Sequence, residues 1–164
     1  MDLTRRFADY DAFWERHANP KSGWSRFLSV PLLVLAAYTR DRRLFAVALG
    51  WTLVNPVAFP RVDRGDGDRV GDGDRVGDGD RVGDDPAWMT RVVDAERAWL
   101  RGETSPGSWS RLNAVSGPVT AYALYAAYRR RPVRAVVAGA ASMALKLAFV
   151  WGLERRWDAG TAGR

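Results

Sequence analysis

Four apolar blocks with short basic segments between them constrain the fold of this chain more than any other feature of its sequence. A helix needs about 20 apolar residues to cross a hydrocarbon core of about 30 Å. The last block meets that length, the two middle blocks fall short of it, and the first must start near Trp24 to reach it. We therefore predict an all-α protein built as a four-helix integral membrane bundle of two hairpins; four buried helices of a soluble bundle are the alternative. The blocks are FLSVPLLVLAAY (27–38), LFAVALGWTLVNPVAF (44–59), NAVSGPVTAYALYAAY (113–128) and VRAVVAGAASMALKLAFVW (133–151).

The charges between the blocks alternate in sign. The hairpins TRDRR (39–43) and RRRPVR (129–134) are basic, whereas residues 61–112 carry nine arginines against twelve acidic residues, a net charge of −3. Short loops rich in Lys and Arg stay in the cytoplasm. We thus predict a multi-pass protein of the cell membrane, with hairpins 39–43 and 129–134 cytoplasmic and the long loop and both termini outside. Tryptophans near the block ends agree, because indoles favour the water–lipid interface; they are Trp24, Trp51, Trp109 and Trp151.

The net charge of +6 and the pI near 10.3 also suit a nucleic-acid partner. The arginines, however, lie in clusters between the apolar blocks rather than along one helical face. We therefore expect no nucleic acid to bind, and a soluble basic bundle that binds nucleic acid is kept as an alternative.

Two amphipathic interfacial helices are predicted to flank the spans, and the apolar stripe of the second would lie on the membrane surface or dock on the bundle. One covers residues 3–17 and ends before Asn19-Pro20. The other has Asp85 as its N-cap, Pro86 in its first turn and Gly102 at its end. Their apolar positions recur at spacings of three and four; they are Leu3, Phe7, Tyr10, Trp14 and His17 in the first, and Trp88, Val92, Ala95 and Trp99 in the second.

A six-residue repeat, GDGDRV in three copies, begins at Gly65 within the low-complexity stretch 62–85. Each copy holds two aspartates beside an arginine, and the third oxygen ligand and distal Glu of a calcium loop are missing. So much glycine and charge leaves too little apolar surface to offset the entropy of ordering. We expect a single helical membrane domain over 1–164 with a disordered insertion at 62–85, and we expect the repeat not to bind calcium.

Few residues suggest chemistry. The chain has no cysteine and one histidine, so thiol sites and multi-histidine metal sites are excluded. We expect no cofactor, no metal and no catalytic residue. A candidate polar site combines an imidazole at a helix end, an Asn-Pro pair in a span and charges on the second amphipathic helix; its residues are His17, Asn19, Asn55, Glu96 and Arg97.

Two features of the last block bear on packing. Small residues at spacings of four permit close helix contact, and with it association into a homo-oligomer; they are Ala135, Ala138, Gly139 and Ser142. Lys146 lies five residues from Trp151, so its stem can reach the nearby interface without any functional role.

Three stretches in combination carry a resemblance: FWERHANPKSGWSR, WTLVNPVAFP and PAWMTRVVDAERAWL. With them the chain resembles a family of small multi-span helical membrane proteins, a domain of unknown function found largely in halophilic archaea. The resemblance covers most of the chain outside 62–85 and implies location and architecture, but no catalytic residues. A fainter likeness is to membrane dioxygenases of fatty-acid breakdown, whose iron site requires several histidines where this chain has only His17.

We therefore expect a non-enzymatic membrane component that is structural or binds lipid or a partner, with the lipid bilayer itself as its main partner. A small membrane enzyme or carrier for a lipid-like substrate is the alternative. The five candidate residues distinguish the two classes: a shared cavity favours the second, and scattered positions favour the first.

Overall fold

The structure is a computed structural model that describes residues 3–62 and 87–162. These residues are helical, with no strand among them, which confirms the all-α prediction. The helices are α1 (Leu3–Ala8), α2 (Asp11–His17), α3 (Pro20–Arg26), α4 (Ser29–Thr39), α5 (Arg42–Ala58), α6 (Trp88–Arg101), the 3₁₀ turn η1 (Gly107–Trp109), α7 (Ser110–Tyr128) and α8 (Pro132–Ala162).

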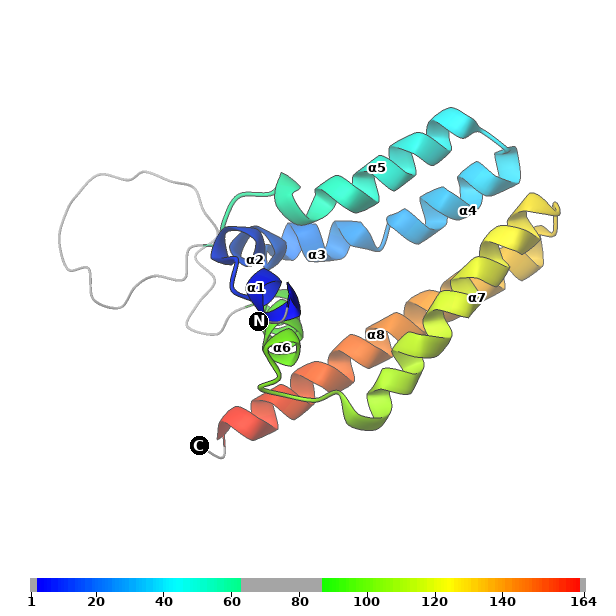
Figure 1. Cartoon of the computed structure of the whole chain (residues 1–164). Helices are drawn as coiled ribbons and strands as arrows, with labels where there is room; N and C mark the ends of the chain where they lie inside the picture. The colour runs from blue at the N-terminus through cyan, green and yellow to red at the C-terminus, as the bar shows by residue number, and fades with distance from the viewer. Residues whose placement is uncertain (1–2, 63–86, 163–164) are drawn as a thin grey trace.

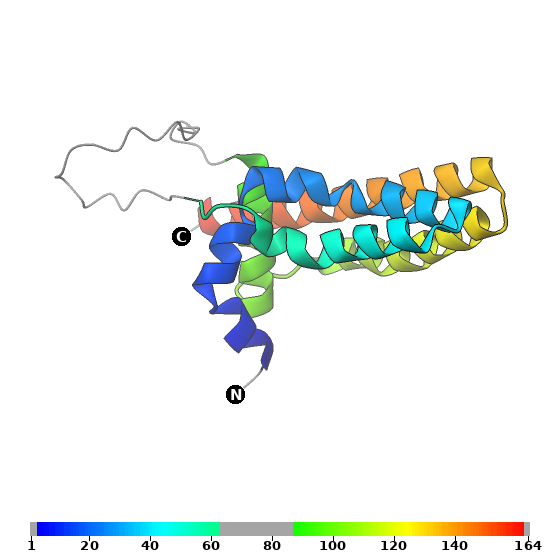
Figure 2. The ribbon, with the colours of Figure 1, turned by 90° about the horizontal axis from the view of Figure 1, so that it is seen from above.

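Two long hairpins form the body of the molecule (Figure 1). Helices α3 and α4 run end to end and turn back into α5, while α7 turns back into α8. The two hairpin turns lie at the same end of the molecule, which we call the tip (Figures 1 and 2). Helices α1, α2 and α6 gather at the opposite end, which we call the cap, and α6 lies there between the two hairpins.

The tip brings the two predicted basic hairpins together. Arg40 Nη2 donates to the carbonyl oxygen of Tyr128 at 3.2 Å, and the same guanidinium lies 4.8 Å from the Tyr128 ring centroid. Arg130 in turn lies 5.2 Å from the ring centroid of Tyr38. Both arginines have a φ of 58°, in the left-handed region that glycine usually occupies at such turns.

The bundle between tip and cap has small residues inside and large ones outside. Its buried positions are mostly alanine, and these permit close approach of the helices; they include Ala36, Ala48, Ala123, Ala126, Ala127, Ala135 and Ala138. The exposed positions on the same helices are large and apolar; they include Phe45, Val47, Leu49, Leu53, Val54, Tyr122, Val136 and Val137. A soluble bundle has the opposite distribution, because its large apolar side chains leave water.

The cap holds the core of large side chains. Met89, Val92 and Ala95 of α6 pack against Phe149, Val150 and Leu153 of α8. Val93, the residue after Val92, faces another side of α6 and packs against Trp14 and Ala18. The predicted stripe of α6 thus docks on the bundle, with Trp88 and Trp99 packed beside it.

Close backbone approach fixes the docking of the cap. A Cβ atom added at Gly152 would lie 2.2 Å from the indole ring of Trp109, and one at Gly23 would lie 1.9 Å from Met89 Cγ. Ion pairs add to this packing, with Arg91 Nε 3.0 Å from Glu154 and Arg101 Nε 3.0 Å from Asp9.

Several predicted boundaries were wrong. The amphipathic helix expected over 3–17 is broken into α1 and α2 at Asp9–Tyr10, because the indole of Trp14 donates to the carbonyl oxygen of Phe7 and folds the chain back. Helix α6 begins at Trp88 with Ala87 as its N-cap, and it ends at Gly102 as predicted. Within the stretch 62–85, Val62 packs on the cluster of Trp14 and Val93; residues 63–85, with the repeat and Asp85, lie outside the described residues, as does Pro86.

The lengths of the helices bear on the predicted spans. Within the described residues one helix, over Pro132–Thr161, is long and apolar enough to cross a membrane. Helix α4 has 11 residues and α5 has 17, so α4 reaches a spanning length only together with α3. The coarse architecture is therefore an all-α fold with one such helix.

Candidate functional site

His17 ends α2 at the junction of cap and bundle. Its side chain is buried, with the ring stacked on Phe13 at a centroid distance of 5.2 Å and edge-on to Trp14 at 5.6 Å. Arg26 of α3 donates from Nη1 to His17 Nε2 at 2.7 Å. Because a guanidinium can only donate, Nε2 accepts and the proton of the neutral ring lies on Nδ1. Among the described residues Nδ1 has no hydrogen-bond partner.

Glu96 of α6 approaches the same nitrogen, with Oε2 3.8 Å from His17 Nε2. Burial lowers the pKa of His17; the contact with Glu96 opposes this shift and the charge of Arg26 adds to it. Burial acts to raise the pKa of Glu96, but the contact with His17 and the positive charges of Lys146 and Arg26 outweigh it and leave that pKa lowered. At neutral pH the pair is therefore a neutral imidazole beside an ionised carboxylate.

A polar pocket of about 300 Å³ lies beside this pair, between the two hairpins, and α6 forms part of its wall. We define it by its polar side chains, Arg26, Glu96, Asn113, Ser116, Thr120, Ser142 and Lys146; apolar residues such as Phe27, Val30, Met89 and Met143 complete its wall. Charged and hydrogen-bonding groups thus converge where the bundle, otherwise built from apolar side chains, meets the cap, and Lys146 among them is exposed.

The polar side chains of the pocket hold one another in place. Lys146 Nζ donates to Asn113 Oδ1 at 3.0 Å, and the ammonium lies 5.0 Å from the ring centroid of Phe149. The Ser142 hydroxyl donates to the carbonyl oxygen of Ser116 at 3.0 Å and contacts the hydroxyl of Thr120. Lys146 was predicted only to reach the membrane interface. Its bond to Asn113 of α7 and its position on the pocket wall were not predicted.

The five predicted site residues do not form one site. Of the five, only Glu96 lines the pocket. His17 lies 3.8 Å from Glu96 without lining the pocket, and Asn19, Asn55 and Arg97 lie elsewhere. Asn19 caps α3 by accepting from the backbone N–H of Lys21 at 2.9 Å, and its Nδ2 donates to the carbonyl oxygen of Pro60 at 3.2 Å.

Asn55 and Arg97 are buried and structural. Ser22 Oγ donates to Asn55 Oδ1 at 3.0 Å and Asn55 Nδ2 donates to Ser25 Oγ at 2.7 Å, which ties α5 to α3. Arg97 Nε donates to the carbonyl oxygen of Ala8 at 2.8 Å, and its guanidinium pairs with Asp11. The amide of Asn55 thus joins α5 to its neighbour α3.

Most of the pocket residues were not predicted from the sequence, although their spacing carries a signal. Asn113, Ser116 and Thr120 follow one another at spacings of three and four within an apolar block, and Ser142 and Lys146 do so in another. Such spacing puts polar groups on one helix face. That the two faces meet each other, and meet Arg26 and Glu96, depends on the packing of four helices.

Two further observations bear on chemistry. No group of three His, Cys, Asp or Glu residues comes close enough to hold a metal ion within residues 3–62 and 87–162. Comparisons with protein-family models, with curated proteins and with solved structures find no match for this chain.

Proposed function

We propose that this chain is a small integral membrane protein with four spans that binds a lipid-like molecule without transforming it. The observation that carries the proposal is the distribution of residue sizes in the bundle, with alanines buried and large apolar side chains exposed. Lipid tails are as apolar as leucine, so a bundle in lipid gains nothing by burying large side chains and packs through small ones.

The charges support the same placement. Residues 27–39, 44–60, 112–128 and 135–145 contain no charged side chain, so an uncharged band surrounds the bundle between tip and cap. Residues 20–39 would span about 30 Å and α7 about 28 Å at the helical rise of 1.5 Å per residue, with Lys21, Arg26 and Arg111 at the cap end of these helices. Helices of this length reach across a hydrocarbon core of about 30 Å. Arginines crowd the tip beyond this band, which favours the tip as the cytoplasmic end.

The polar pocket supports the binding part of the proposal. Charged and hydrogen-bonding groups that converge on one pocket are typical of a binding site. Here Arg26, Glu96 and Lys146 line a pocket of about 300 Å³, a volume at the lower end for small-molecule sites. The resemblance to small multi-span membrane proteins is in keeping with this location, and membership of that family stays a prediction.

A homo-oligomer is a secondary part of the proposal. The small residues of α8 are already used inside the chain, since Gly139 faces Val30 and Val34 of α4, and Ser142 binds α7. Association would therefore use other positions of α8, such as the exposed Val133 and Val137.

A membrane enzyme or carrier is the second candidate, and the meeting of His17 and Glu96 favours it. Glu96 is ionised and lines the pocket, so it can accept a proton from a bound molecule, with His17 3.8 Å away on its other side. Incubation of the purified protein with membrane lipids, followed by mass analysis of the extracted lipids, separates the two candidates. Lipids recovered unchanged support binding alone, and a new product shows catalysis.

The test of membrane insertion is a carbonate wash of membranes from cells that express the tagged protein. We expect the protein to stay in the pellet and to need detergent for release, as an integral protein of the same cells does. Release into the supernatant together with a peripheral marker would contradict insertion. The four blocks would then be core helices of a soluble bundle, and nucleic-acid binding would be tested next.

A further inference from the structure

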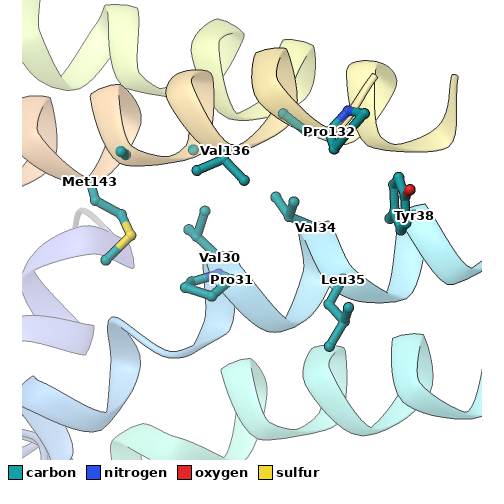
Figure 3. Close-up of a pocket in the computed structure, with 11 residues that line it drawn as sticks. Val30, Pro31, Val34, Leu35, Tyr38, Pro132, Val136 and Met143 are labelled. Atoms are coloured by element: carbon teal, nitrogen blue, oxygen red, sulfur yellow. The ribbon is translucent and has the colours of Figure 1, made fainter. Parts of the chain in front are cut away.

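An apolar groove runs along the outside of the bundle and leads to the polar pocket. It has a volume of about 390 Å³ and lies between α4 and α8 (Figure 3). Val30, Pro31, Val34 and Leu35 line one side of it, and Pro132, Val136 and Met143 line the other. Val30 and Met143 also belong to the wall of the polar pocket, so the two hollows are neighbours that share those side chains.

The two hollows follow one another along α8. The groove extends from Pro132 to Met143, about 16 Å at the helical rise, and the polar pocket continues from Ser142 to Val150 for about 12 Å. The apolar end points to the tip and the polar end to the cap, where Trp109 and Trp151 lie 5.8 Å apart by ring centroid. A lipid of the leaflet on the cap side has the same direction, with its head at the tryptophan level and its chains toward the bilayer centre.

The groove is open toward the surroundings of the bundle. Val136 is 66% exposed and Leu35 is 49% exposed, so its rim would face hydrocarbon once the bundle is inserted. A chain of a neighbouring lipid could therefore enter sideways without leaving the apolar phase.

The charges of the polar pocket specify the head. Arg26 and Lys146 are positive and Glu96 is negative, while His17 beside them is neutral because its Nε2 accepts from Arg26. One positive charge is thus left over. A head group with a single negative charge would neutralise the pocket, whereas a zwitterionic head would bring a second cation into it.

We propose that the groove and the polar pocket together hold one anionic membrane phospholipid, with a chain in the groove and its phosphodiester head against Lys146 and Arg26. This inference rests on the proposed membrane insertion and names the molecule bound. The Nζ of Lys146 keeps donors free beyond its bond to Asn113, since an ammonium has three. Thr120 and Ser142 line the same pocket, and their hydroxyl protons are donated to the carbonyl oxygen of Ser116, so the charged donors are Lys146 and Arg26.

The test is native mass spectrometry of the full-length protein in a neutral detergent, after equilibration with phosphatidylglycerol or with phosphatidylcholine. We expect one phosphatidylglycerol to be retained per chain, with at least about tenfold preference over phosphatidylcholine. Lys146→Gln should lower that retention about tenfold, because hydrogen bonds to charged groups are the stronger ones. Lys146→Arg should restore it. The matched control is Lys21→Gln, at the only other lysine of the chain, which is exposed on α3 and should retain lipid as wild type does.

A second pair of variants tests the groove without touching a charge. Ala140→Phe adds a ring to the groove wall and should lower retention of phosphatidylglycerol, whereas Ala141→Phe, at an exposed neighbour that lines neither hollow, should not. This pair carries the test if Lys146→Gln does not fold, as judged by circular dichroism.

The outcomes separate this inference from the proposed function. Equal retention of both phospholipids, or equal loss in Lys146→Gln and Lys21→Gln, overturns the anionic phospholipid while the carbonate wash can still show insertion. A parallel sample contains dodecanoate, a fatty acid with a carboxylate head. If the protein retains more dodecanoate than phosphatidylglycerol, its ligand is a fatty acid, and the phospholipid proposal is wrong. A protein that leaves the membrane in carbonate fails both proposals.

Discussion

At the scale of single residues, burial is what gives the polar side chains of the cap their properties. The ring of His17 is enclosed by Phe13 and Trp14 and receives a hydrogen bond from Arg26, so a proton on Nε2 would meet a guanidinium at 2.7 Å. Glu96, 3.8 Å away, is the opposing charge that faces the same nitrogen. The neutral ring is therefore maintained by its surroundings, and its charge state is coupled to folding.

That coupling predicts a loss of stability on mild acidification. The pKa of His17 lies below its ordinary value of 6.5, so below about pH 6.5 the unfolded chain binds a proton that the folded chain does not. The free energy of unfolding should then fall as the pH is lowered from 7.5 to 5.5. In His17→Gln, which cannot titrate, the fall should be smaller; thermal melts in detergent at several pH values measure both.

Carboxylates complicate this measurement only at lower pH. The pKa of Glu96 is lowered, so its contribution to stability is present above its ordinary value and is lost as the pH falls through the lowered value. Keeping the melts above pH 5 leaves His17 as the group that distinguishes the two proteins. A wild-type melting temperature that rises toward pH 5.5 would mean that Glu96 outweighs burial and that the folded ring takes up a proton.

At the scale of the helices, α6 is the element that joins the parts. One face packs on α8 through Met89, Val92 and Ala95, and another on the N-terminal helices through Val93. Periodicity in the sequence predicted this helix and its apolar stripe, because an amphipathic pattern survives whatever partner covers it. The break between α1 and α2 could not be predicted in this way, since it depends on a tertiary bond from Trp14 to the Phe7 carbonyl.

Because η1 packs on α8, alanine substitutions at two glycines of α8 should change the stability of the protein differently. At Gly152 an added methyl group would lie 2.2 Å from the Trp109 ring, whereas at Gly160 it would meet nothing within 4 Å. Gly152→Ala should therefore destabilise the protein by about 1–3 kcal/mol through overpacking. Gly160→Ala should leave it unchanged or stabilise it by up to about 1 kcal/mol, because alanine favours a helix over glycine.

Melting temperatures in the same detergent compare the two variants with wild type. Equal melting temperatures for Gly152→Ala and Gly160→Ala would show that the indole of Trp109 moves aside freely. The packing of η1 on α8 would then contribute little to the cap.

At the scale of the whole molecule, composition along the chain predicted more than local patterns did. The two basic hairpins were predicted to lie on one side, and the structure places both at the tip, with Arg40 bonded to Tyr128 across them. The polar pocket could not be predicted, because Asn113, Lys146 and Glu96 are far apart in sequence and meet only once four helices pack. Conversely, Asn55 suggested a site by its neighbour Pro56, yet it serves to join α5 to α3.

The arrangement predicts which end of the molecule faces the cell exterior. The chain has no cysteine, so single cysteines can be introduced without background. In intact cells we expect Thr161→Cys, near the cap, to react with a membrane-impermeant maleimide and Arg131→Cys, at the tip, to stay unlabelled. Permeabilised cells provide the control, in which both should react. Labelling of Arg131→Cys alone in intact cells would reverse the proposed orientation.

The left-handed arginines at the tip have a consequence for attempts to engineer this protein. Arg40 and Arg130 hold a φ of 58°, a conformation that typically costs a residue other than glycine about 1–3 kcal/mol. A screen for heat resistance would therefore select glycine at these two positions if the strain relieved exceeds the loss of the Arg40 and Arg130 contacts with Tyr128 and Tyr38. The same substitutions remove two of the charges expected to anchor the tip in the cytoplasm, so a screen for correct insertion would reject them. A screen for heat resistance and a screen for correct membrane insertion would thus rank the same variants in opposite order.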